Sequence, residues 1–249
     1  MTLKQKLKNG ETLTGSWITF SDPSVAEVMA KAGFDWLTID LEHSSINIKQ
    51  AEDLIRTIDL CGVSPLVRLT SNDSDLIKRV LDAGAKGIIV PMVKSLKDAK
   101  KAIDSAYYPP KGIRSFGLAR AQGYGVDFEE YLQQSSDETI VIVQIEHIDA
   151  LEELEEILSL ETIDAYIIGP YDLSGSMGIP GKFENEKYLD AIQFIRRTAE
   201  RVNKPGGIHI VEPDIEAYEK ALKDYSLIAF SVDFRILDVI SRNATKKKN

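Results

Sequence analysis

The feature that most restricts the fold is a repeated alternation of short apolar segments with longer amphipathic ones. Eight short runs rich in valine, isoleucine and leucine are predicted to be strands: Leu13–Ile18, Trp36–Leu41, Pro65–Leu69, Gly87–Val90, Thr139–Ile145, Ala165–Ile168, Gly206–Ile210 and Leu227–Val232. Runs such as 87–90 and 140–143 contain no alternating polar residues. They are therefore typical of parallel strands that are covered on both faces.

The segments between these strands carry the signals of helices. Asp22-Pro23, for example, places an N-cap residue before a proline, and Gly33 follows the last helical position. The predicted helices are 23–32, Ile48–Leu60, Asp73–Ala83, Leu96–Ala106, Phe128–Gln133, Ala150–Leu158, Glu186–Val202, Asp214–Lys223 and Phe234–Arg242.

Eight strand–helix units in 249 residues predict a (β/α)₈ TIM barrel. The alternative is an open, doubly wound sheet. However, no Gly-x-Gly-x-x-Gly follows the first strand, so the usual dinucleotide signature of that alternative is missing. Because the sequence has no internal repeat or low-complexity linker, we expect residues 1–249 to form one domain.

Composition narrows the functional classes. A formal net charge of −9 argues against a general nucleic-acid-binding surface, which needs basic patches. The single cysteine, Cys61, excludes an intrachain disulfide and favours a reducing compartment. No apolar run approaches the roughly 18–20 residues of a membrane span. We therefore expect a cytoplasmic protein that binds neither nucleic acid nor membrane and acts on a small molecule.

Polar side chains follow several of the predicted strands at the point where each strand ends. In a TIM barrel these ends meet at one mouth, where the chemistry takes place. The residues are Asp40, Glu42 and His43 after the second strand, Arg68 in the third, Gln144 and Glu146 in and after the fifth, and Asp172 after the sixth. Their convergence predicts an active site.

Two of these carboxylates, Glu146 and Asp172, are candidate ligands of a divalent metal. Mg²⁺ typically takes one or two carboxylates, keeps several waters and leaves positions for substrate oxygens. The alternative is that each carboxylate caps the helix that follows it. From the residues alone, both interpretations stay open.

Arg68 and the histidines are open to two interpretations as well. Arg68 lies in an apolar strand, where its guanidinium either forms a structural ion pair or binds a substrate carboxylate or enolate oxygen. His43 suits a general acid or base, although many loop histidines are simply exposed. His147 and His209 also fall near strand ends and rank lower.

The segment between Tyr107 and Val126 is rich in glycine, proline and aromatic residues and is too long for a plain turn. It is predicted to be a lid or an oligomer contact. If it folds over the mouth, Arg114 and Arg120 would carry positive charge toward an anionic substrate.

Several of these segments, in this order, resemble the HpcH/HpaI family of class II pyruvate aldolases. They are Phe34–His43, Val67–Arg68, Val90–Val93, Tyr108–Arg114, Val143–Glu146 and Ile168–Ser174. The likeness runs from Gly15 to about Leu237. The resemblance implies a TIM barrel of the phosphoenolpyruvate/pyruvate type. It also implies a homo-oligomer, a trimer or hexamer, often a trimer of dimers with exchanged C-terminal helices.

The resemblance also assigns roles to individual residues. Glu146 and Asp172 match the metal ligands, and Gln144 a substrate contact. The backbone N–H of Tyr171 matches the group that meets the pyruvate carboxylate. Arg68 matches the arginine that steadies the enolate. His43 matches the general base, with Asp82 as the acid that raises its basicity and Asp40 nearby.

The chain departs from the family pattern at three places. Tyr171 replaces a small residue. The end of the eighth strand reads Phe230-Ser231-Val232-Asp233, where the family usually has Gly-Val-Asp, and the stretch 207–212 also differs. These changes leave the proposed ligands intact, so they bear on the acceptor aldehyde more than on the reaction class.

The resemblance implies a metal-dependent aldolase, a carbon–carbon lyase that joins pyruvate to an aldehyde or cleaves a 4-hydroxy-2-oxo acid. The cofactor is expected to be Mg²⁺, Mn²⁺ or Co²⁺, acting as a Lewis acid without a lysine Schiff base. Two alternatives remain: a citrate-lyase-like or acyl-CoA lyase on the same barrel, and a barrel that binds a metabolite without turnover.

Overall fold

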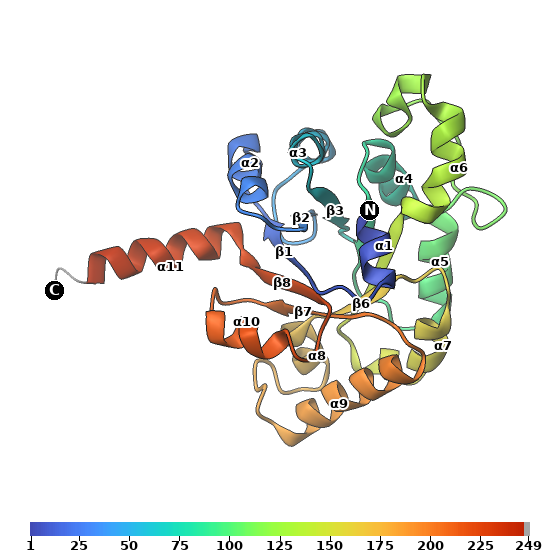
Figure 1. The fold of residues 1–249 in the computed structure, drawn as a ribbon. Coiled ribbons are helices and arrows are strands. Elements are labelled where there is room, and N and C mark those ends of the chain that lie inside the picture. The colour runs from blue at the N-terminus through green and yellow to red at the C-terminus, as the bar shows by residue number, and fades with distance from the viewer. Residues whose placement is uncertain (247–249) are drawn as a thin grey trace.

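A computed structural model describes residues 1–246, and these residues contain a closed barrel of eight parallel strands. The strands pair in sequence order, and β1 closes the barrel against β8 (Figure 1). Their bounds are β1 Leu13–Ile18, β2 Trp36–Asp40, β3 Ser64–Arg68, β4 Gly87–Val90, β5 Ile140–Ile145, β6 Ala165–Ile168, β7 Gly206–Ile210 and β8 Leu227–Val232. The predicted TIM barrel is confirmed.

The helices alternate with the strands as predicted. They are α1 Leu3–Lys8, α2 Pro23–Lys31, α3 Ile48–Leu60, α4 Ser74–Asp82, α5 Leu96–Ala106, α6 Phe128–Glu138, α7 Leu154–Ser159, α8 Pro170–Ser176, α9 Glu186–Arg201, α10 Ile215–Ala221 and α11 Asp233–Lys246, with two 3₁₀ turns, η1 Arg120–Gly125 and η2 Ile148–Leu151. Helices α1 and α8 were not predicted. The last three residues of the predicted 1–249 domain lie outside the described part.

The apolar side chains form two layers. One fills the inside of the barrel and includes Trp17, Trp36 and Leu66, which are at most 2% exposed. The other lies between the strands and the surrounding helices. Because both faces of each strand are covered, the strands read as continuous apolar runs in the sequence. Within residues 1–246, no helix is both long and apolar enough to cross a membrane.

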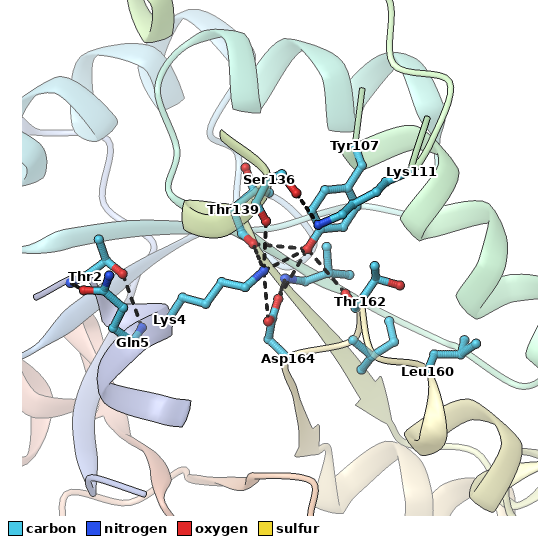
Figure 2. Close-up of polar contacts among 12 residues, drawn as sticks. Thr2, Lys4, Gln5, Tyr107, Lys111, Ser136, Thr139, Leu160, Thr162 and Asp164 are labelled. Atoms are coloured by element: carbon cyan, nitrogen blue, oxygen red, sulfur yellow. Dashed lines mark hydrogen bonds and ion pairs between the residues drawn. The ribbon is translucent and has the colours of Figure 1, made fainter. Parts of the chain in front are cut away.

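Helix α1 closes the amino-terminal end of the barrel with a buried ion pair (Figure 2). The ammonium of Lys4 lies 3.1 Å from Asp164 and donates to the Thr139 carbonyl at 2.8 Å and to the Tyr107 hydroxyl at 3.1 Å. Asp164 also accepts the N–H of Val141. Burial lowers the pKa of Lys4 and raises that of Asp164, so burial disfavours the charged form of both side chains. Each side chain's charge is in turn favoured by the opposite charge of the other.

The excursion after α5 lies at this same end, so it does not fold over the mouth, and the condition under which its arginines would approach a substrate is not met within this chain. Arg114 is buried, stacks on Tyr108 with its guanidinium carbon 4.6 Å from the ring centre, and donates to Asp82. Arg120 donates to Asp59. Helices of a β/α barrel run back toward the amino ends of the strands, so a loop that follows a helix emerges opposite the mouth.

Candidate active site

Neighbouring strands bring Asp40 and Arg68 together at the carboxyl end of the barrel. The two residues are direct partners in the β2–β3 register. Arg68 Nε donates to Asp40 Oδ1 at 2.9 Å, and Nη2 donates to Oδ2 at 2.6 Å. This bidentate pair is shielded from solvent, since Arg68 is 8% exposed and Asp40 is 2% exposed. Arg68 therefore has the structural partner that a guanidinium inside a barrel needs.

Beyond its ion pair with Asp40, the guanidinium of Arg68 can make contacts through its face and through Nη1. Its carbon lies 4.3 Å from the ring centre of Trp17 on β1, a cation–π contact across the end of β2. Nη1 makes no hydrogen bond with any of residues 1–246, and Arg68 lines a cavity at the mouth. The structural and the substrate-binding interpretations of Arg68 are thus compatible.

The turn after β2 is held by Asp40. Its Oδ1 accepts the backbone N–H of Glu42 at 3.0 Å and of His43 at 3.3 Å. Glu42 Oε2 then lies 3.4 Å from Arg68 Nε. Burial, together with the negative charges of Asp40 and Asp172, raises the pKa of Glu42 to about 7, although Arg68 acts in the opposite direction.

His43 projects from this turn toward solvent. Its side chain is 63% exposed, and Nε2 lies 3.8 Å from Glu42 Oε2. The partner predicted for it, Asp82, is not brought to it within the chain. Asp82 is the last residue of α4, at the opposite end of the barrel, where Arg114 binds it. One chain alone therefore provides no His43–Asp82 pair.

Glu146 is buried directly after β5 and is held at both oxygens. Oε1 accepts the N–H of Met92 at 2.7 Å, and Oε2 accepts from the side-chain amide of Gln144. Burial first of all, and then the charges of Glu42 and Asp172, raise the pKa of Glu146 to about 7, against the effect of the Met92 N–H. The carboxylate is fixed in place, and no cationic side chain among residues 1–246 forms an ion pair with it.

A glycine makes this position possible. A Cβ at Gly169, the residue after β6, would stand 2.6 Å from Glu146 Oε2 and 2.9 Å from Gln144 Nε2. Both distances are shorter than Cβ contacts in real proteins. Because Gly169 has no side chain, the backbone at the end of β6 can approach the carboxylate of Glu146 at the end of the neighbouring β5.

Helix α8 follows at once and carries Tyr171 and Asp172 in its first turn. Backbone N–H groups in a first turn have no acceptor within the helix, so they are available to a ligand. The ring of Tyr171 is 55% exposed and meets Phe183 edge to face at 5.1 Å between ring centres. Tyr171 is one of the residues that line the cavity at the mouth.

These residues fit a divalent cation that takes few protein ligands. The charges of Glu42 and Asp172 raise the pKa of Glu146, and the charge of Asp172 raises the pKa of Glu42, a repulsion that a cation would relieve. Gln144 Oε1 is buried and has no hydrogen-bond partner. In the described part of the chain no group of three or more acidic, histidine or cysteine side chains is arranged to hold a metal. The set therefore suits one or two carboxylates completed by water and substrate oxygens.

The cavity at the mouth has a volume of about 230 Å³, and its wall includes Arg68, Gln144, His43 and Asp172. The sequence did not single out Trp17, Gly169 or the Met92 N–H as parts of this site. Trp17 would have been found by asking which residues of the first strand point inward near its carboxyl end. His147 accepts the N–H of Asp149 and caps η2, which is a structural role.

Comparisons with known proteins identify the family and agree with the barrel fold. The model of the HpcH/HpaI aldolase/citrate lyase family matches residues 13–234. The chain belongs to this family.

Two curated relatives and one solved structure are representative. The hydroxypyruvate/pyruvate aldolase of Sagittula stellata is 37% identical over 82% of this chain and 81% of its own length. The 2-keto-3-deoxy-L-rhamnonate aldolase of Escherichia coli is 35% identical over 85% of this chain and 80% of its own. A family member from Burkholderia cenocepacia superimposes with a TM-score of 0.93 at 30% identity, covering 98% of each chain.

Proposed function

We propose that this protein is a divalent-metal-dependent lyase that makes or breaks the bond between pyruvate, or a close 2-oxo acid, and an aldehyde. Its similarity to proteins named hydroxypyruvate/pyruvate aldolase and 2-keto-3-deoxy-L-rhamnonate aldolase supports the reaction class. The observation that carries the proposal is the buried carboxylate of Glu146, which is near enough to the charge of Asp172 to be affected by it and follows β5 at the end of the barrel where Asp172 and Arg68 line a cavity.

Glu146 and Asp172 would hold the cation, and Gln144 and the N–H of Tyr171 would bind the 2-oxo acid. A bound divalent cation supplies Lewis-acid polarisation of the 2-oxo acid. Mg²⁺ and Mn²⁺ suit these oxygen ligands, and Co²⁺ is a further candidate.

Arg68 adds a fixed positive charge where negative charge develops on the 2-oxo acid. Because Asp40 holds two of its nitrogens, the guanidinium is already oriented before substrate binds. His43, whose exposed side chain lies beside Glu42, would take the proton of the 4-hydroxyl group in the cleavage direction. Asp40 acts by fixing both Arg68 and the His43 turn.

The metal site can be tested without measuring turnover. We expect Mn²⁺ to bind the purified apoprotein in a calorimetric titration, and Glu146→Gln and Asp172→Asn to weaken that binding strongly. Glu152→Gln, a change outside the cavity just after η2, is the matched control and should bind as the wild type does. Equal Mn²⁺ binding by all four proteins would overturn the assignment.

The reaction can be tested with pyruvate, a panel of aldehydes and Mn²⁺, with the aldol product as the readout. Chelation should abolish turnover, and borohydride with pyruvate should leave the enzyme active, because no lysine forms a Schiff base. Covalent trapping of pyruvate on a lysine would refute the scheme. Acyl-CoA thioesters assayed in parallel test the citrate-lyase-like alternative, and α-proton exchange of pyruvate tests the non-catalytic one.

We also propose that the protein is a homo-oligomer, a trimer or hexamer, in which α11 packs on a second copy. Figure 1 shows α11 extending away from the barrel. Phe234, Leu237 and Ile240 on this helix are 48%, 60% and 64% exposed, an apolar surface that a partner would cover. Light scattering of wild type and of Leu237→Glu should show a loss of subunits in the variant, and an unchanged mass would contradict the proposal.

A further inference from the structure

Asp233 is a buried carboxylate at the junction of β8 and α11, at the mouth end of the barrel. It is 5% exposed and is the first residue of α11, the helix that extends away from the barrel (Figure 1). Its Oδ2 accepts the backbone N–H groups of Thr19 at 2.7 Å and of Phe20 at 2.8 Å. Its Oδ1 accepts the Thr19 hydroxyl at 2.5 Å and the Phe234 N–H at 2.8 Å. One side chain thus ties the segment after β1 to the start of α11.

A bulge in β8 brings Asp233 to this position. From Gly15 to Trp17 the residues of β1 advance by two, whereas their partners in β8 advance by three, so β8 carries one extra residue. Ser231 lies in this stretch with a positive φ of 54°, and its hydroxyl donates to the Val211 carbonyl at 2.9 Å. An extra residue changes which face of the sheet the following side chains occupy. The bulge is therefore the local feature that places Asp233 against the segment after β1.

The segment that Asp233 holds begins two residues after Trp17, which lines the mouth cavity. The ring centre of Trp17 lies 4.3 Å from the guanidinium carbon of Arg68 and 5.3 Å from the ring centre of His209. Burial and the positive charge of Arg68 lower the pKa of His209 to about 3, so Arg68 is the charged one of these two neighbours. The contact between Trp17 and Arg68 therefore depends on where the end of β1 is held.

The tether lies across the barrel from the proposed metal ligands. Asp233 acts on the end of β1, whereas Glu146 follows β5 and Asp172 follows β6. Because the eight strands pair in sequence order in a closed barrel, β1 and β5 are opposite each other. A change at Asp233 should leave metal binding intact, so bound metal can be used to count the folded active sites.

We propose that Asp233 is a positioning residue of the aldolase reaction. By fixing the end of β1, it holds the ring of Trp17 against Arg68 and so sets where the positive charge of Arg68 meets the 2-oxo acid. This inference rests on the proposed function, in which Arg68 stabilises the developing negative charge. Asp40 fixes the edge of the guanidinium, and Trp17 fixes its face. Fixed charge lowers a barrier most when it needs no rearrangement during the reaction, so a displaced Trp17 lowers kcat.

The experiment compares Asp233→Asn with the unchanged residue in a Trp36→Phe background. The chain has two tryptophans, so in this background the fluorescence reports on Trp17 alone. Asparagine has the size of aspartate, but its NH₂ group cannot accept the hydrogen bonds that the second oxygen accepts. We expect Trp17 to emit at a longer wavelength and to be quenched more strongly by acrylamide. We expect kcat per bound Mn²⁺ to fall about 10-fold to 100-fold, with the Mn²⁺ affinity unchanged in calorimetry.

Asp238→Asn is the matched control. It is the same substitution in the same helix, at a side chain that is 32% exposed and pairs with Arg235 and Arg242. Its Trp17 fluorescence and kcat should equal those of the background protein. A milder variant, Thr19→Val, removes only the hydroxyl bonded to Asp233 and keeps the backbone N–H groups. It should shift the fluorescence and kcat in the same direction by a smaller amount, and it tests the tether if Asp233→Asn does not fold.

A purely structural role of Asp233 predicts fewer Mn²⁺ sites with an unchanged kcat per site. That result, or an unchanged Trp17 emission in Asp233→Asn, overturns the positioning role and leaves the aldolase function intact. If Asp233→Asn does not fold, an unchanged emission and kcat in Thr19→Val overturn it in the same way. A wild type that turns over pyruvate with no aldehyde overturns the proposed function, and the role of Asp233 in the reaction falls with it.

Discussion

Replacing Gly169 with alanine tests the geometry around Glu146 with the addition of a single methyl group. The new Cβ would stand 2.6 Å from Glu146 Oε2, whereas ordinary van der Waals contacts begin near 3.4 Å. The carboxylate must therefore retreat by about 0.8 Å. The φ of Gly169 is −96°, which alanine adopts freely, so the backbone itself is not strained.

A displacement of this size acts on the chemistry more than on the fold. Misplacing a group in an active site by about 1 Å can cost about 100-fold in rate, which corresponds to about 2.7 kcal/mol of transition-state stabilisation. We expect kcat/KM of Gly169→Ala to fall by about that factor at saturating Mn²⁺, with a weaker affinity for the metal. Steady-state kinetics and a calorimetric Mn²⁺ titration measure the two effects.

The neighbouring Gly175 provides the control. It lies in the same helix, α8, and a Cβ there would meet nothing within 4 Å. Gly175→Ala should keep its activity and gain about 0.5–1 kcal/mol of stability, because alanine loses less conformational freedom than glycine in a helix. Full activity and wild-type metal affinity in Gly169→Ala would refute the close approach of Gly169 to Glu146.

Three further predictions follow from the described contacts. Lys4→Met should lower the free energy of unfolding by about 3–5 kcal/mol, since Asp164 is left buried and unpaired, and adding Asp164→Asn should recover part of the loss in urea titrations; equal stability of the single variant and the wild type would contradict this. Because the folded pKa of His209 lies near 3 and the unfolded value near 6.5, the folded state binds fewer protons between these values. The stability of wild type relative to His209→Gln should therefore fall by about 1.4 kcal/mol per pH unit as the pH drops from 6 to 4, and a difference independent of pH would show that the ring is not held neutral. Arg68→Lys should lower kcat about 100-fold or more while unfolding at a higher urea concentration than Arg68→Ala, since a lysine keeps a charge near Asp40 but not the two-pronged contact; undiminished kcat would exclude the proposed role.

The strands could be predicted closely from the sequence because a strand that is buried on both faces is a continuous run of apolar residues. β1, β4, β6, β7 and β8 have the predicted bounds, β2 and β5 differ by one residue at one end, and β3 is shifted by one residue at both ends. Helix α8 was missed because its sequence, with Pro170 and Gly175, resembles a loop. It forms because the chain leaves β6 through Gly169 and proline suits the first turn of a helix.

The residues that follow strands were placed correctly at the mouth, whereas two kinds of inference failed or stayed open. Arg114 and Arg120 would approach the substrate only if their segment folded over the mouth, but this segment follows a helix and lies at the other end of the barrel. Asp82 ends a helix and lies there too, so its role beside His43, taken from the family resemblance, is not met within one chain.

The direction of the chain explains this division. In a β/α barrel every strand points to the mouth and every helix points away from it, so a residue's place depends on which kind of element it follows. Asp40, Arg68 and Glu146 end or follow strands, and the structure brings them to one site. The close contacts inside the site differ from this chain direction because they cannot be predicted from the order of strands and helices. The approach of Gly169 to Glu146 and the hydrogen bonds that Asp233 accepts from the segment after β1 depend on distances of tenths of an ångström, which no pattern of residue types encodes. A sequence of this type therefore predicts where chemistry takes place, and the packed side chains determine which substrate takes part in it.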